Sequence, residues 1–190
     1  MAGQYAIGQP KGLRKLIIEG GPHDIPAYAK VCERFLRALP QEMQDTIARC
    51  DKEGTTDSDE YKAVEMYYYT LHLCRVVPFP KELMETFEEA DKDSTVYTTM
   101  QGPNEFSATG TLKDFDITDQ LHKIIEKTCP GGILVMNGRY DTVADETTQG
   151  FFYRPSCRTK WIQYGLSSHL PQLEETEKFV KDLGMFLTTD

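Results

Sequence analysis

The chain has 190 residues, of which 39% are hydrophobic and 27% are charged, so its composition is that of a folded globular domain rather than a disordered segment. Lys and Arg number 21 against 30 Asp and Glu, and the net charge of -9 argues against binding to nucleic acid or to an anionic membrane, which both favour a basic surface. No apolar run approaches the ~18–20 residues of a bilayer span, and residues 1–12 show no secretory signal pattern. We therefore expect a cytoplasmic protein that binds neither nucleic acid nor membrane.

The five cysteines predict free thiols in a reducing compartment. Their number is odd, no C-x-x-C pair occurs, and no cluster of Cys and His has the spacing of a metal site. The sequence therefore predicts no metal site.

The first elements in chain order are a helix and a strand. Residues 2–7 read as the end of a helix that stops near Gly8 and Pro10. Residues 13–18 contain a short apolar run that predicts a buried strand, and the glycines and proline at 20–22 end it. A helix end followed by a strand is typical of an α/β fold entered in the middle of a repeating unit.

Residues 23–125 read as helical, because apolar side chains recur at helical spacing between prolines and polar turns. The clearest stripe consists of Val64, Tyr67, Tyr68, Leu71 and Cys74. No second strand pattern is clear in this region, and a long helical run inside an α/β chain predicts an inserted lid. We expect a partial α/β core formed by 1–22 and 126–190, and a helical lid formed by 23–125.

Residues 126–190 return to the α/β pattern. Residues 132–136 and 160–165 each predict a strand, and residues 173–187 predict an amphipathic helix. The apolar face of that helix is expected to carry Leu173, Thr176, Val180, Leu183 and Leu187. The predicted fold class is α/β, with about three parallel strands, flanking helices and an inserted helical lid.

Two residues that can form an acid–base pair follow the second and third predicted strands. Asp141 follows the strand at 132–136, and His169 follows the strand at 160–165. Ligands of open α/β sheets bind beyond the carboxyl ends of the strands, so both residues lie where a site is expected. A carboxylate placed in this way can hold an imidazole by one ring nitrogen and leave the other as a general base. Each residue alone more often serves as a turn, cap or surface residue, and the ordered pair strengthens the case for a function without deciding it.

The order acid, strand, base and C-terminal helix is that of the α/β-hydrolases, whose triad runs Ser, Asp or Glu, His along the chain. Five segments carry a more specific similarity: YAIGQPKGL (5–13), QGPNEF (101–106), TGTLKDFDITD (109–119), NGRYD (137–141) and SHLPQLEE (168–175). Together they resemble the C-terminal part of the proline iminopeptidase (prolyl aminopeptidase) and L-amino-acid amidase group. The resemblance covers essentially the whole chain, and it implies the C-terminal part of an α/β-hydrolase fold.

The resemblance also implies residue roles. Asp141 matches the triad acid, His169 the triad base, and Glu105 the lid carboxylate that pairs with the free α-amino group of the substrate. A carboxylate that faces an ammonium group forms a charge-assisted hydrogen bond, which selects substrates with a free N-terminus. Thr142 stands where the family often has a second acidic residue, and Phe115 where it has a tryptophan. No metal or organic cofactor is implied.

The family's nucleophilic serine has no counterpart in these 190 residues. No G-x-S-x-G motif occurs, and Ser167 and Ser168 lie on the wrong loop for a nucleophile elbow. By register, the elbow and the first five strands of the sheet would precede Met1. The strand at 13–18 would then have an open edge, and we expect that edge to pair with a protein partner or with another copy of the chain.

Three functions remain open at this point. The first is a truncated hydrolase that releases N-terminal residues from peptides or hydrolyses amino-acid amides in its complete form. The second is a non-catalytic pseudoenzyme, or one half of a two-chain hydrolase. The third is a secondary-metabolite tailoring enzyme that uses the Asp141 and His169 pair as a general base.

Overall fold

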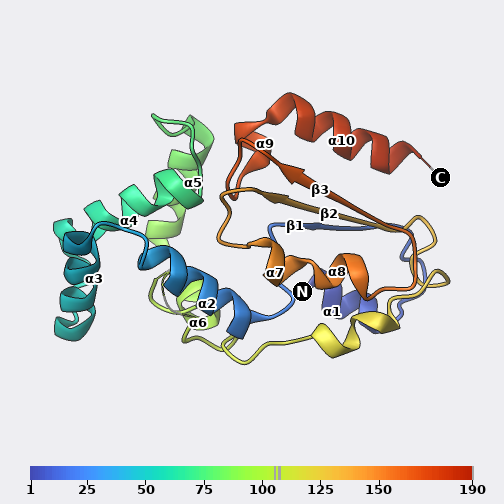
Figure 1. Cartoon of the computed structure of the whole chain (residues 1–190), viewed down its shortest axis with the longest axis horizontal. Helices are drawn as coiled ribbons and strands as arrows, with labels where there is room; N and C mark the ends of the chain where they lie inside the picture. The colour runs from blue at the N-terminus through green and yellow to red at the C-terminus, as the bar shows by residue number, and fades with distance from the viewer. Residues whose placement is uncertain (105, 107, 190) are drawn as a thin grey trace.

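A parallel sheet of three strands forms the centre of the computed structural model, which describes residues 1–104, 106 and 108–189 (Figure 1). The strand order is β1-β2-β3, and the strands span Leu16–Glu19, Ile133–Gly138 and Thr159–Tyr164. In register, Leu16 lies opposite Ile133, and Ile133 lies opposite Thr159. The predicted α/β class with about three parallel strands is confirmed, although each strand boundary shifts by one to three residues.

Helices cover both faces of the sheet (Figure 1). One face packs Leu16, Ile18, Ile133 and Val135 against α1 (Ala2–Ile7), the 3-10 helix η1 (Thr118–Lys123) and α8 (Gly150–Tyr153). The other face packs Leu134, Met136 and Tyr164 against α10 (Thr176–Thr188). All six residues of β2 are buried, which explains why this strand reads as a continuous apolar run instead of an alternating one.

Five further helices lie to one side of the sheet (Figure 1). They are α2 (Ile25–Leu36), α3 (Gln41–Glu53), α4 (Asp59–His72), α5 (Lys81–Lys92) and α6 (Thr95–Met100). The first three of them, α2 to α4, share a core of their own, in which Leu39, Ile47, Cys50, Tyr61, Val64 and Tyr68 are buried together. Within the predicted stripe of α4, Tyr68 is 1% exposed, whereas Tyr67 is 40% exposed and lies on the surface.

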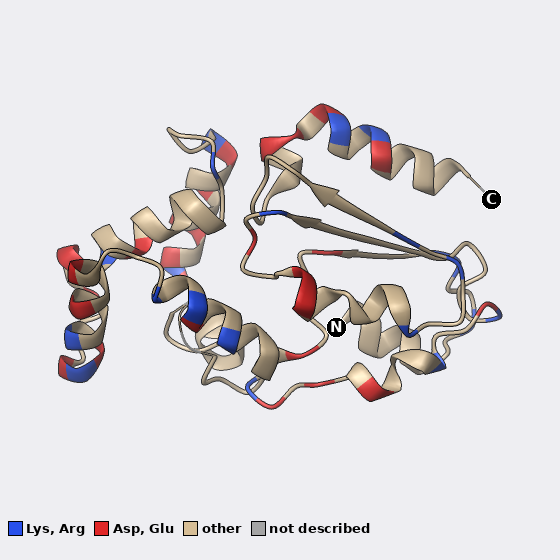
Figure 2. Ribbon diagram, in the orientation of Figure 1, with Lys and Arg blue, Asp and Glu red and all other residues tan. Residues whose placement is uncertain are grey.

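Local capping marks three of these helix ends. The Asp24 carboxylate accepts the backbone N–H of Ala27 (2.9 Å) at the start of α2, and the Ser58 hydroxyl accepts that of Tyr61 (3.4 Å) at the start of α4. Gly54 ends α3 in the left-handed conformation, with φ of 70°. Figure 2 shows that charged residues gather on the helices and loops and that the three strands carry few of them.

The chain leaves the sheet after β1 and returns before η1 at nearly the same point. Asp24 and Asp116 form an isolated antiparallel bridge, and the Ile117 N–H donates to the His23 carbonyl (3.0 Å). We call residues 23–25 and 115–117 the neck. The predicted division into a core (1–22 and 126–190) and a lid (23–125) stays a prediction. Within the range predicted as lid, η1 packs on the sheet.

The C-terminal helix differs from the prediction. The predicted helix at 173–187 is divided into α9 (Pro171–Glu174) and α10. The residues of α10 that pack on the sheet are Phe179 and Phe186, whereas Val180 is 61% exposed, so the predicted apolar face is wrong. Two apolar stripes overlap on this helix, and the larger aromatic rings bury more area against the sheet. Among the described residues, no helix is long and apolar enough to span a bilayer.

Candidate functional site

Asp141 and His169 lie in contact beyond the carboxyl ends of neighbouring strands. Asp141 follows β2 and His169 follows β3, and Nδ1 of His169 is 3.0 Å from Oδ1 of Asp141. The Asp141 side chain is fully buried, and that of His169 is 33% exposed. The structure therefore brings together the two residues that the sequence predicts as an acid–base pair.

The surroundings of Asp141 fix its carboxylate in place. Oδ1 also accepts the backbone N–H of Val143 at 2.7 Å. The Asn137 side chain braces the same loop, because it donates to the Val143 carbonyl (3.3 Å) and accepts the indole N–H of Trp161 (2.9 Å). Oδ2 of Asp141 is buried and has no hydrogen-bond partner among the described residues. An oriented, desolvated carboxylate of this kind holds an imidazole in one tautomer and stabilises its protonated form.

Two glycines allow the loops to approach each other closely. A Cβ at Gly138, the last residue of β2, would overlap the carbonyl oxygen of Ser168, so only glycine fits under the His169 loop. A Cβ at Gly20, just after β1, would lie 2.7 Å from Cε1 of His169. The imidazole therefore packs directly on the backbone at the end of β1.

Glu19 is a site residue that the sequence analysis does not identify. It is the last residue of β1, and its Oε1 is buried without a hydrogen-bond partner among the described residues. Burial raises the pKa of the Glu19 carboxyl above its ordinary value, while His169 lowers it and Asp141 raises it further. The signal in the sequence was a carboxylate directly after an apolar strand run.

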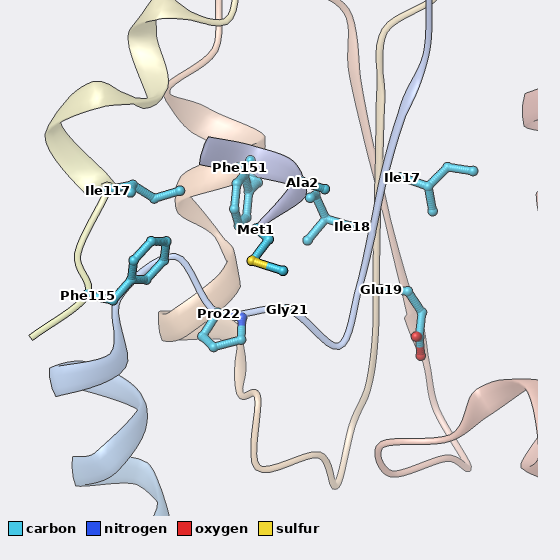
Figure 3. A pocket seen from close by; sticks show the side chains of 11 residues that line it. Met1, Ala2, Ile17, Ile18, Glu19, Gly21, Pro22, Phe115, Ile117 and Phe151 are labelled. Carbon is cyan, nitrogen blue, oxygen red and sulfur yellow. The ribbon is translucent and has the colours of Figure 1, made fainter. Parts of the chain in front are cut away.

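A small hollow lies along the free edge of β1 (Figure 3). Met1, Ala2, Ile18 and Phe151 point toward it, whereas the Glu19 side chain points to the other side of the strand. The described residues place no strand beside this edge. Leu16 donates its N–H to Gly132, just before β2 (3.1 Å), and Gly20 donates to Met136 in β2 (3.0 Å). The alternating backbone groups of Ile17 and Glu19 therefore face away from β2 and toward the free edge.

The end of α4 lies against both site loops. His72 Nδ1 is 2.8 Å from the Tyr140 carbonyl, and the Arg75 guanidinium lies 3.8 Å from the centre of the Tyr140 ring. Burial lowers the pKa of His72, and its hydrogen bond to the Tyr140 backbone opposes that effect. The backbone N–H of His169 donates to the Leu73 carbonyl at 3.2 Å.

Two consecutive glutamates hold the His169 loop from the other side. Glu174 accepts hydrogen bonds from the backbone N–H groups of Ser168 (2.9 Å) and Leu170 (3.1 Å), and Glu175 accepts that of Leu166 (3.0 Å). These contacts give the His169 loop a defined shape although the loop has no regular secondary structure.

Other predicted positions have different outcomes. Glu105, the predicted partner of a substrate amine, lies outside the described residues. Thr142, next to Asp141, is 8% exposed, and Phe115 packs against the sheet core at the neck. Among the described residues, no three His, Cys, Asp or Glu side chains lie together in a way that could hold a metal ion.

Comparisons with known proteins show similarity along the whole chain. No family model matches it. The proline iminopeptidase of Heyndrickxia coagulans is 32% identical over 189 residues, which are 100% of this chain and 63% of that protein. The proline iminopeptidase of Saccharolobus solfataricus is 32% identical over 96% of this chain and 57% of its own length.

Two solved structures share the fold at similar identity. The crystal structure of VinJ superposes with a TM-score of 0.88 and 34% identity, over 98% of this chain and 61% of that one. The proline iminopeptidase of Mycobacterium smegmatis superposes with a TM-score of 0.82 and 30% identity, over 98% of this chain and 60% of that one. The chain thus spans about 60% of the length of the relatives that it matches.

Proposed function

The chain belongs to the proline iminopeptidase family of α/β-hydrolases, of which it spans the C-terminal part, and we propose that it supplies the acid, the base and the lid of a hydrolase of that type. Its substrates are peptides, from which it releases the N-terminal residue, or amino-acid amides. The observation that carries the proposal is the 3.0 Å contact between Asp141 and His169 beyond neighbouring strand ends. The alternatives of a pseudoenzyme and of a tailoring enzyme find no support in the relatives.

The proposed reaction uses His169 twice. Asp141 accepts a hydrogen bond from Nδ1–H of His169, which leaves Nε2 to take the proton of a serine hydroxyl as the serine oxygen attacks the amide carbonyl. When the C–N bond breaks, Nε2 returns that proton to the leaving amine, and an acyl-enzyme remains. Water then attacks the ester carbonyl while Nε2 of His169 takes a proton from it. As the ester C–O bond breaks, Nε2 returns this proton to the serine oxygen, and the carboxylic acid product leaves.

The serine in this mechanism belongs to polypeptide outside residues 1–190, because the sequence contains no G-x-S-x-G motif. The free edge of β1 offers it a way to dock, since unpaired strand edges accept a further strand through backbone hydrogen bonds. In this proposal a strand paired with β1 carries the nucleophile toward Gly20, and thus toward His169, at the carboxyl end of the sheet.

Substrate selection is proposed to depend on charge. Glu105 would accept hydrogen bonds from the free α-amino group of the substrate, and such a bond between two ionised groups is about twice as strong as a neutral one. The net charge of -9 also favours a cationic substrate over an anionic one.

The test is an activity assay on the natural form of the protein, with L-prolyl and other aminoacyl anilides as substrates. We expect hydrolysis, labelling by a serine-directed fluorophosphonate, and a fall of about 10³–10⁴ in kcat for Asp141→Asn. His169→Gln should abolish both activity and labelling. Full activity in either variant, or absence of hydrolysis by the natural form, would refute the proposal.

A further inference from the structure

Glu174 connects the lid to the loop that carries His169. Its Oε2 accepts the backbone N–H groups of Ser168 (2.9 Å) and Leu170 (3.1 Å), the residues on either side of His169. Its Oε1 accepts the backbone N–H of Arg75 (2.8 Å) and the Ser168 hydroxyl (3.0 Å). One carboxylate therefore binds four donors, three of them around His169 and one at the end of the lid helix α4.

The same stretch of the lid makes further contacts with both site loops. Leu73 accepts the backbone N–H of His169, and His72 and Arg75 lie against Tyr140, next to Asp141. The segment 72–75 therefore touches the loop of the acid and the loop of the base together. Glu174 supplies a carboxylate acceptor to this arrangement, and hydrogen bonds to a charged acceptor are stronger than neutral ones.

We propose that Glu174 is a positioning residue that couples the lid to His169: the end of α4 is fixed to Glu174, and through it the lid sets the orientation of the imidazole toward Asp141. The inference rests on the proposed function, because it assigns His169 the role of catalytic base. Glu174 itself touches neither His169 nor the reacting atoms.

A glutamine at this position separates the two halves of the contact. In Glu174→Gln the remaining carbonyl oxygen can still accept the N–H groups of Ser168 and Leu170. The amide NH₂ can donate to the Ser168 hydroxyl, but it cannot accept the N–H of Arg75. The substitution thus keeps the loop brace and removes the link to the lid.

The measurement is amide hydrogen exchange on the chain itself. We expect the Arg75 amide of Glu174→Gln to exchange roughly ten- to a hundredfold faster, which corresponds to the loss of a charge-assisted hydrogen bond. The amides of Ser168 and Leu170 should keep their protection. The decisive amide is that of His169, which is bonded to Leu73 and not to Glu174. Coupling requires that its exchange also becomes faster and that the low-field Nδ1 proton signal of His169 weakens.

Glu175→Gln is the matched control. Glu175 accepts hydrogen bonds from the Leu166 N–H (3.0 Å) and the Ser167 hydroxyl (2.7 Å) of the same loop. The Arg75 N–H donates to Glu174 and not to Glu175. The remaining carbonyl oxygen of Glu175→Gln can still accept both donors, so we expect the Leu166 amide to keep its protection and the Arg75 and His169 amides to stay unchanged. If Glu174→Gln leaves the His169 amide at its wild-type rate, or if the control accelerates it equally, Glu174 is only a local brace and the inference is wrong.

A kinetic readout on the active natural form separates this inference from the proposed function. Glu174→Gln should lower kcat by roughly tenfold or more, because a small misplacement of a catalytic group is costly, and should change KM by less than about twofold. A lid that merely loosened over the substrate would raise KM instead and would contradict the coupling. Failure of the proposed function would appear as absence of hydrolysis in the wild type. Failure of the coupling would appear in the exchange data whether or not the wild type is active, and as a raised KM where it is active.

Discussion

Replacing Gly20 by alanine tests the contact between the end of β1 and His169. Gly20 has φ of 51°, a conformation that costs a residue with a Cβ about 1–2 kcal/mol. The new Cβ would lie 2.7 Å from Cε1 and 3.0 Å from Nδ1 of His169, so the imidazole must move by several tenths of an ångström or more. Loss of the bond to Asp141 adds about 1 kcal/mol, and we expect a total destabilisation of about 2–3 kcal/mol.

Gly21→Ala is the control for this substitution. Its nearest side-chain neighbour would be Cγ2 of Ile18 at 3.2 Å, and its φ lies outside the left-handed region. Both variants lose the same backbone freedom in the unfolded chain, so that contribution cancels in the comparison. Urea unfolding followed by the fluorescence of Trp161, the one tryptophan, gives the free energies. If Gly20→Ala unfolds within about 0.5 kcal/mol of Gly21→Ala and keeps the low-field His169 proton, the described contact is not present.

Further predictions concern a buried acid, a buried base and the core. Burial raises the pKa of the Glu19 carboxyl above 4.5, so the wild type loses stability as the pH rises through the folded pKa. Glu19→Gln should therefore be more stable than the wild type at pH 7 and no more stable than it below pH 4.5. An equal gain in stability at both pH values would contradict this. Burial lowers the pKa of His23 below 6.5, so the wild type should lose stability as the pH falls through the folded pKa, and His23→Gln should show a flatter Tm profile between about pH 7.5 and 5. Leu134→Ala, at a fully buried position of β2, should lower the free energy of unfolding in urea by about 2–5 kcal/mol. Val180→Ala, on the exposed side of α10, should change it by less than about 0.5 kcal/mol. Similar values for the two variants would refute the assigned packing face of α10.

The strands were predictable because a parallel sheet buries both faces of each strand. Residues 16–18 and 133–136 are therefore apolar without alternation, a pattern that short sequences reveal well. The face of α10 was not predictable in this way. Val180 and Phe179 are apolar neighbours on the helix, and the area that each of two overlapping stripes can bury against the sheet decides which of them is packed.

The acid–base pair was predictable for a topological reason, since Asp141 and His169 each follow a strand and parallel strands place their carboxyl ends together. The supporting residues were not. Glu174 binds Arg75, which is 99 residues away in the sequence, and a glutamate in a polar stretch carries no local sign of such a partner. Glu19 falls at the edge of an apolar run, where a strand prediction usually stops. Glu105 lies outside the described residues and stays a prediction.

The neck has a consequence for the order in which the molecule folds. β1 and β2 pair directly although the whole helical segment separates them in the chain, and closing so long a loop slows folding of a sheet. The bridge between Asp24 and Asp116, with the bond from Ile117 to His23, brings the two ends of that segment together next to the strands. Once the neck has formed, most of the closure entropy has already been lost, and a much shorter connection separates β1 from β2. Substitutions in the neck should therefore slow folding more than their effect on stability would suggest.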